Sequence, residues 1–142
     1  MNIGFIYTIC AGITWGLVYT INQRILSNTS PITLLFIDSI VTAIVLLPVL
    51  FIDQGSIRSL LTSGKSNLLI LFASIIFAII ANFLIYSGIK SVGASYASII
   101  EIAYPFFVVL FTYLFFHVKP NMYFFIGGLL VFIGSAIIIY FQ

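Results

Sequence analysis

The chain has 142 residues, of which 63% are apolar and 6% are charged, whereas a soluble domain carries about 25% charged residues. A small water-soluble fold cannot cover that much apolar surface, because its surface grows nearly as fast as its volume. The composition therefore predicts an integral membrane protein with the lipid bilayer as its solvent. The five basic side chains are spread singly along the chain, which disfavours nucleic acid as a partner, because phosphate binding needs a basic cluster.

Five apolar segments are each long enough to cross the hydrocarbon core, which takes about 20 helical residues. In chain order they cover residues 3–21, 31–52, 67–89, 93–116 and 122–141. The expected connections contain charge, Pro, Gly, Ser or Asn and cover residues 22–30, 53–66, 90–92 and 117–121. The apolar runs do not alternate as barrel strands do. The predicted fold class is an all-α membrane protein with five transmembrane helices in one domain, residues 1–142.

The first segment carries aromatic and small residues on one side. Trp15 and Tyr19 are four residues apart, as are Gly12 and Gly16, so each pair shares a helix face. We expect both aromatic side chains to line a substrate cavity, where Trp15 can stack on a ring or a cation. Anchoring at the membrane interface is the alternative for Trp15. The two glycines predict close helix packing.

Cys10, the single cysteine, is expected to be a buried thiol rather than a lipid anchor. The N-terminus lacks the basic stretch of a secretory signal, so the first helix is expected to be retained.

The second and third segments contribute polar side chains at membrane depth. Asp38 lies seven residues after Pro31, about 10 Å along a helix, and is a candidate second wall of the cavity. A carboxylate at the headgroup boundary is the alternative. Asn82 and Tyr86 are four residues apart on the third segment, and both are candidate cavity residues. Hydrogen bonding between helices explains Asn82 equally well.

The fourth segment contains Glu101, the strongest candidate for a functional residue. A carboxylate within the hydrocarbon costs several kcal/mol unless it pairs with a counter-charge, is protonated or faces water. Pro105 follows one turn later and has no N–H for the carbonyl of Glu101. With Ser98 one turn earlier, this region can hold a proton, a cation or a substrate amine, and Pro105 can bend the helix. The alternative is a protonated glutamic acid with a structural role.

The last segment has a smooth surface of small residues and is the candidate dimer contact. Its small residues are Gly127, Gly128, Gly134 and Ser135. No second His or Cys is placed to form a metal site with His117, and no phosphate loop or Ser/His/Asp set is present. We therefore expect no metal, no cofactor and no enzymatic activity.

The positive charges of the loops are nearly balanced between the two sides of the membrane. The side that holds the N-terminus carries Arg58, Lys65 and Lys119, and the opposite side carries Arg24 and Lys90. This difference weakly favours a cytoplasmic N-terminus, and the near balance also suits dual topology, in which copies insert both ways. Many transporters pair two repeats of opposite topology. A lone repeat with an odd number of helices obtains its inverted partner from a second copy or from a homologous half.

Several short motifs resemble the EamA-like drug/metabolite transporter (DMT) superfamily. They are Trp15-Gly16, Ser30-Pro31-Ile32-Thr33, Tyr86-Ser87-Gly88-Ile89-Lys90, Gly93-Ala94-Ser95-Tyr96-Ala97-Ser98 leading into Glu101-Ile102-Ala103-Tyr104-Pro105, and Gly127-Gly128 with Gly134. The resemblance covers nearly the whole chain, and residues 86–116 are its most specific part. It implies one half-repeat of the ten-helix DMT fold, a membrane location, and export or exchange of small metabolites.

The predicted function is secondary transport, by export or exchange, of small metabolites or drug-like compounds. We expect an antiparallel homodimer, or a pair with a homologous half, that works by alternating access in the plasma membrane of a prokaryote. Two alternatives remain: a non-transporting accessory subunit of another membrane protein, and a flippase for lipid-linked carriers.

Overall fold

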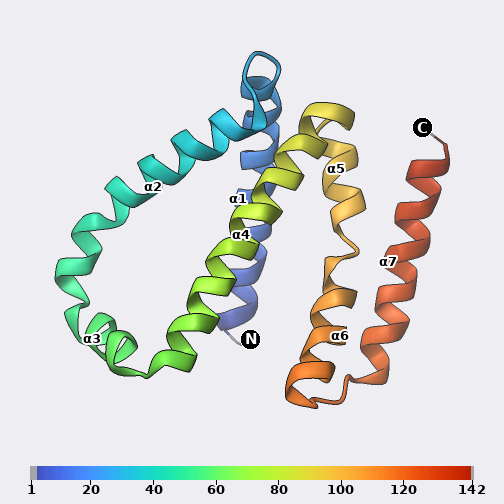
Figure 1. Ribbon diagram of the computed structural model, residues 1–142. Coiled ribbons are helices and arrows are strands. Elements are labelled where there is room, and N and C mark those ends of the chain that lie inside the picture. The colour runs from blue at the N-terminus through green and yellow to red at the C-terminus, as the bar shows by residue number, and fades with distance from the viewer. Residues whose placement is uncertain (1–2, 142) are drawn as a thin grey trace. The chain divides into compact units, whose positions relative to one another are not determined.

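The structure is a computed structural model that describes residues 3–141 (Figure 1). Its helices are α1 (Ile3–Leu26), α2 (Pro31–Ile52), α3 (Gln54–Thr62), α4 (Lys65–Val92), α5 (Ala94–Glu101), α6 (Tyr104–Phe116) and α7 (Met122–Tyr140). Within the described range, five helical spans are long and apolar enough to cross a membrane, and α5 and α6 together form one of them. The predicted all-α fold class with five transmembrane helices is confirmed.

The boundary of α2 shows how local chemistry starts a helix at the predicted residue. The hydroxyl oxygen of Ser30 accepts a hydrogen bond from the backbone N–H of Thr33 at 3.1 Å, which satisfies one of the free N–H groups of the first turn. Pro31 occupies the first helical position, where its missing N–H costs nothing. The predicted span of residues 31–52 therefore matches α2.

Two other helices are longer than the predicted apolar segments. Residues 3–21 were expected in the first helix, but α1 continues to Leu26. Residues 67–89 were expected in the third span, but α4 covers Lys65–Val92. The apolar run sets how much of a helix lies in hydrocarbon, whereas the helix itself continues until a turn ends it. The prediction that residue 22 begins a loop was therefore wrong.

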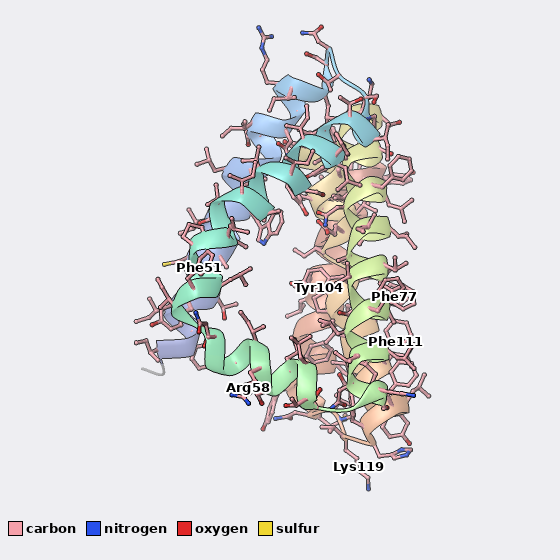
Figure 2. The ribbon with its side chains drawn as sticks, turned by 60° about the vertical axis from the view of Figure 1, so that its left-hand side comes forward. Phe51, Arg58, Phe77, Tyr104, Phe111 and Lys119 are labelled. Carbon is pink, nitrogen blue, oxygen red and sulfur yellow. The ribbon has the colours of Figure 1, made fainter. Side chains whose placement is uncertain are left out.

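A short helix, α3, occupies part of the connection that was expected to lack one. Ile57, Leu60 and Leu61 fall on one side at 100° per residue, with Arg58 at the edge of that side and Ser59 opposite it. The side chain of Arg58 extends away from α3 (Figure 2). Nine residues are too few to cross a membrane, so a search for spans misses this helix.

The fourth span is interrupted rather than continuous. The prediction was one helix over residues 93–116, but α5 ends at Glu101 and α6 begins at Tyr104. Pro105 is at the start of α6, where it cannot donate to the carbonyl of Glu101. The N–H of Phe106 bonds to the carbonyl of Ala103 at 3.1 Å, a three-residue step that is tighter than α-helix. The helix therefore breaks directly after its only carboxylate.

The chain forms two compact units. One contains residues 3–21 with 92–141, and the other is Asn22–Ser91. In the second unit, the amine of Lys90 donates to the carbonyl of Thr29 at 2.7 Å, which ties the end of α4 to the loop between α1 and α2. The buried apolar side chains of this unit are Leu26, Leu34, Leu35, Tyr86 and Ile89.

In the first unit, α6 and α7 run side by side in opposite directions (Figure 1). The ring of Phe106 on α6 meets Phe124 on α7 edge to face, with centroids 5.9 Å apart. Large apolar side chains in both units face outward, as Phe77 does at 71% exposure (Figure 2). Such a surface is stable only when lipid covers it.

Candidate functional site

Glu101 is held by Tyr19 of α1, which packs against a second aromatic residue of the same helix. The hydroxyl of Tyr19 donates to a carboxylate oxygen of Glu101 at 2.5 Å, across 82 residues of sequence. Trp15, one turn before Tyr19, packs edge to face on the Tyr19 ring with centroids 5.7 Å apart and planes at 65°. Three predicted site residues from two helices therefore converge, and we refer to Trp15, Tyr19 and Glu101 as the Glu101 cluster.

The helix break adds backbone acceptors to this cluster. After Glu101, the N–H of Ile102 is shared between the carbonyls of Ser98 and Ile99 at 3.1 and 3.3 Å. The carbonyl of Glu101 has no N–H to accept from Pro105, which lies half-buried at the start of α6. Non-helical backbone at membrane depth is tolerated where it lies inside protein or lines a wet cavity. The break therefore places a carboxylate in the same turn as a carbonyl that Pro105 leaves without its usual helical donor.

A second carboxylate, Asp38, is held by a tyrosine in the other unit. The hydroxyl of Tyr86 on α4 donates to Asp38 on α2 at 2.9 Å. Tyr86 is 2% exposed, and the side chain of Asn22, 8% exposed, makes a second hydrogen bond to the same hydroxyl. We refer to Asp38, Tyr86 and Asn22 as the Asp38 cluster.

Asn22 was not predicted as a site residue, because residue 22 was expected in a loop. The signal was present, since Trp15, Tyr19 and Asn22 follow one another at spacings of four and three, which keeps them on one side of a helix. Extending the pattern of the first segment by one turn would have included Asn22.

Two predicted site residues bond within their own helices. The amide of Asn82 donates to the carbonyl of Ala78 at 2.9 Å, and the hydroxyl of Ser98 donates to the carbonyl of Ser95 at 2.9 Å. Within residues 3–141, neither of these hydrogen bonds joins the Glu101 cluster or the Asp38 cluster. Their predicted role in a cavity stays a prediction.

The predicted packing glycines fall into two groups. A Cβ atom added to Gly12, Gly16, Gly127 or Gly134 would meet nothing within 4 Å among residues 3–141. A Cβ at Gly128 would instead lie 2.4 Å from the Cζ atom of Phe106. Gly128 therefore has a packing role inside the chain, against α6, while Gly127 and Gly134 leave an open surface on α7. The predicted dimer contact stays a prediction for that open surface.

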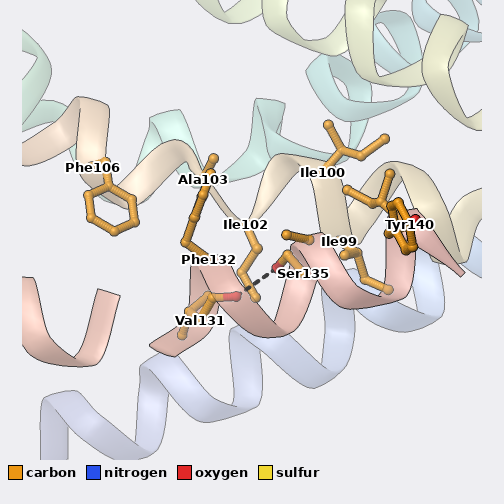
Figure 3. A pocket seen from close by; sticks show the side chains of 11 residues that line it. Ile99, Ile100, Ile102, Ala103, Phe106, Val131, Phe132, Ser135 and Tyr140 are labelled. Atoms are coloured by element: carbon orange, nitrogen blue, oxygen red, sulfur yellow. Dashed lines mark hydrogen bonds between the residues drawn. The ribbon is translucent and has the colours of Figure 1, made fainter. Parts of the chain in front are cut away.

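An apolar groove of about 480 Å³ lies between α7 and the helices α5 and α6 (Figure 3). The hydroxyl of Ser135 in its wall donates to the carbonyl of Val131 at 2.9 Å, so its proton is used by its own helix. The groove is lined by Ile99, Ile100, Ile102, Ala103, Phe106, Val131, Phe132, Ser135, Ala136, Ile139 and Tyr140. Because nearly all of its lining side chains are apolar, the groove suits a hydrocarbon chain.

Comparison with known proteins identifies what the chain resembles. The EamA-like transporter family matches residues 2–140. The uncharacterized transporter YrdR of Bacillus subtilis (strain 168) is 31% identical over 140 residues. That alignment covers 96% of this chain and 43% of the relative, so the chain spans less than half the length of the curated relative it matches. No solved structure matches.

Proposed function

Because this chain belongs to the EamA-like transporter family, we propose that it is a secondary transporter of small organic cations with the Glu101 cluster as its binding site. Its family and its five apolar spans make it an integral membrane transporter of the DMT type. The observation that carries the proposal is a carboxylate fixed by Tyr19, beside Trp15, where the helix breaks.

The chemistry of the Glu101 cluster favours a ligand with a positive charge. The carboxylate of Glu101 neutralises a cation, and the faces of Trp15 and Tyr19 attract it through their electron-rich rings. Glu101 lies seven residues after Ala94 in its own span, about 10 Å of rise. At that depth a bound cation would compensate a carboxylate that is otherwise costly. Metabolites and drug-like compounds with an amine or a quaternary ammonium group satisfy these conditions.

An inverted pair of five-span units would complete the transporter. Transporters of this kind place the substrate near the midplane between two repeats of opposite topology, and one repeat rocks against the other. The coverage of 43% of YrdR supports the idea that the chain corresponds to one such repeat. The second repeat would be another copy or a homologous half in the opposite orientation, and the nearly balanced loop charges permit a second copy to insert that way.

Transport is tested by counterflow in proteoliposomes, with N,N,N-trimethyltyramine as the probe. Its permanent charge prevents leakage as a neutral base. We expect labelled probe to enter vesicles preloaded with unlabelled probe and to saturate with concentration, because a carrier exchanges bound ligand. The matched compound, 4-hydroxyphenylacetate, has the same ring and the opposite charge and should not exchange. Equal exchange of the two compounds would overturn the selectivity for cations. No exchange of either compound, by a protein that co-purifies with an unrelated membrane partner, would favour the accessory-subunit function instead.

The inverted pair is tested at the open face of α7, where Gly127 and Gly134 lie on either side of its midpoint. In an antiparallel pair of α7 helices, residue 127 of one copy meets residue 134 of the other. We therefore expect disulfide crosslinks between Gly127→Cys and Gly134→Cys copies when differently tagged variants are mixed, in a Cys10→Ala background. Each variant alone should crosslink poorly, because like positions are about 10 Å apart along the helix. Self-crosslinking of each variant would indicate a parallel pair, and the inverted arrangement would then be wrong.

A further inference from the structure

Asp38 is a second intramembrane carboxylate, and its surroundings differ from those of Glu101. It lies seven residues after Pro31 in α2, about 10 Å along the helix, where a bare charge is costly. Its side chain is exposed and receives one hydrogen bond, from Tyr86 at 2.9 Å. The other carboxylate oxygen has no hydrogen-bond partner in the part of the chain that the structure describes.

The donor to Asp38 is fixed in place. Tyr86 is 2% exposed and hydrogen-bonded to Asn22, which is itself 8% exposed. A buried tyrosine whose hydroxyl has hydrogen-bond partners on two residues, here Asp38 and Asn22, keeps that hydroxyl in one position. The Asp38 cluster therefore presents one carboxylate oxygen to a rigid donor and leaves the other oxygen accessible.

The charges of the same unit leave Asp38 without a counter-ion. The amine of Lys90, one turn after Tyr86, is directed to the carbonyl of Thr29 at 2.7 Å. Arg24 lies near the end of α1, two residues beyond Asn22. The remaining charged residues of this unit, Asp53, Arg58 and Lys65, follow the far end of α2, which is fifteen or more residues from Asp38 and about 20 Å along the helix. A proton is the simplest partner that would neutralise Asp38.

We propose that Asp38 is the proton-binding residue that couples transport to a proton gradient, separately from substrate binding at Glu101. The inference rests on the proposed transport function. Protonation converts the free carboxylate oxygen of Asp38 to a hydroxyl, while Tyr86 keeps its own proton, and release returns the proton to water. A hard metal cation such as Na⁺ or Ca²⁺ favours a shell of several oxygen ligands, whereas one carboxylate with one hydroxyl donor suffices for a proton.

The test variant is Asp38→Asn, which keeps the shape of the side chain and removes its titration. Counterflow of trimethyltyramine at equal pH on both sides should stay within about twofold of wild type, because exchange needs no net proton movement. Uptake driven by an imposed pH gradient should fall at least tenfold. Asp53→Asn is the matched control, since this acid follows α2 at its far end, and it should leave both measurements unchanged.

Protonation is also measured without transport, by infrared spectroscopy of the carboxylic C=O band across a pH titration in detergent. The difference between the spectra of wild type and Asp38→Asn should contain one titrating band, and the same band should persist in Glu101→Gln. Tyr86→Phe should change the pH at which the band appears, because it removes only the donor hydroxyl.

Gradient-driven uptake that survives in Asp38→Asn, or that follows a Na⁺ gradient, would overturn this role while leaving the transport function intact. Loss of counterflow in folded Asp38→Asn would place Asp38 in substrate binding and would also overturn it. If the wild type shows no counterflow, the transport function fails, and the infrared band still decides whether Asp38 binds a proton.

Discussion

Glu101→Gln is expected to lower trimethyltyramine counterflow at least 30-fold. The glutamine keeps the length and the hydrogen-bonding capacity of the side chain but removes the charge that would pair with the cation. Removing one partner of a desolvated charge pair costs about 2–5 kcal/mol, and about 1.4 kcal/mol is a factor of ten. The measurement is the initial rate of counterflow as a function of probe concentration, and the loss should lie mainly in the apparent affinity.

Two companion variants separate charge from structure. Tyr19→Phe keeps the ring against Trp15 and removes the donor to Glu101, so an intermediate loss is expected. Ser87→Ala is the matched control, because its hydroxyl bonds to the carbonyl of Phe83 in its own helix and it belongs to neither cluster, so counterflow should be unchanged. If Glu101→Gln transports at the wild-type rate with unchanged pH dependence, a charged role for Glu101 is ruled out.

The difference between predicted and observed helices follows from what a hydropathy pattern measures. Residues 31–52 match α2 because Ser30 and Pro31 supply explicit start signals. The end of α1 and the existence of α3 were not predicted, because both involve polar residues that no apolar run includes. Pro105 predicted a bend. The structure instead breaks the helix over two residues, where the N–H groups of Ile102, Ala103 and Phe106 bond to carbonyls three residues earlier.

The candidate residues were identified from sequence, but their partners were not. Tyr86 shares a helix face with Asn82, four residues away, which favours a common role. The structure pairs Tyr86 with Asp38, 48 residues away, and leaves Asn82 bonded within α4. Helical periodicity places side chains on one face of one helix, whereas the choice of facing helix depends on tertiary packing, which a single sequence does not encode in any short pattern.

Two carboxylates with different neighbours suit a division of labour in the proposed transporter. Glu101 lies beside aromatic rings and an interrupted backbone, which suit an organic cation. Asp38 lies beside a buried phenol and an amide, which suit a proton. If a single acid bound both the organic cation and the proton, the two ligands would compete for it. With separate acids, substrate exchange and proton coupling can be lost independently. The variants Glu101→Gln and Asp38→Asn distinguish these cases.

Neighbouring glycines of α7 should respond in opposite ways to the same substitution. Gly→Ala inside a helix is favourable by about 0.5–1 kcal/mol where the added methyl group has space. Gly127→Ala is therefore expected to be neutral or stabilising in the separated chain, because nothing in its described part lies within 4 Å of this Cβ position. At Gly128 the methyl group would lie 2.4 Å from the ring of Phe106. That ring also packs on Phe124, so moving it disturbs a second contact.

Gly128→Ala is accordingly expected to destabilise the protein by about 1–3 kcal/mol, the usual cost of overpacking. The measurement is reversible unfolding in mixed micelles, with the free energies of unfolding of Gly127→Ala and Gly128→Ala compared with wild type. Phe106→Leu shortens the facing side chain, so the double variant with Gly128→Ala should be more stable than the sum of the two single changes predicts. Equal stability of the two alanine variants would mean that α6 and α7 do not pack through Gly128, and the groove between them would then need a different arrangement of its walls.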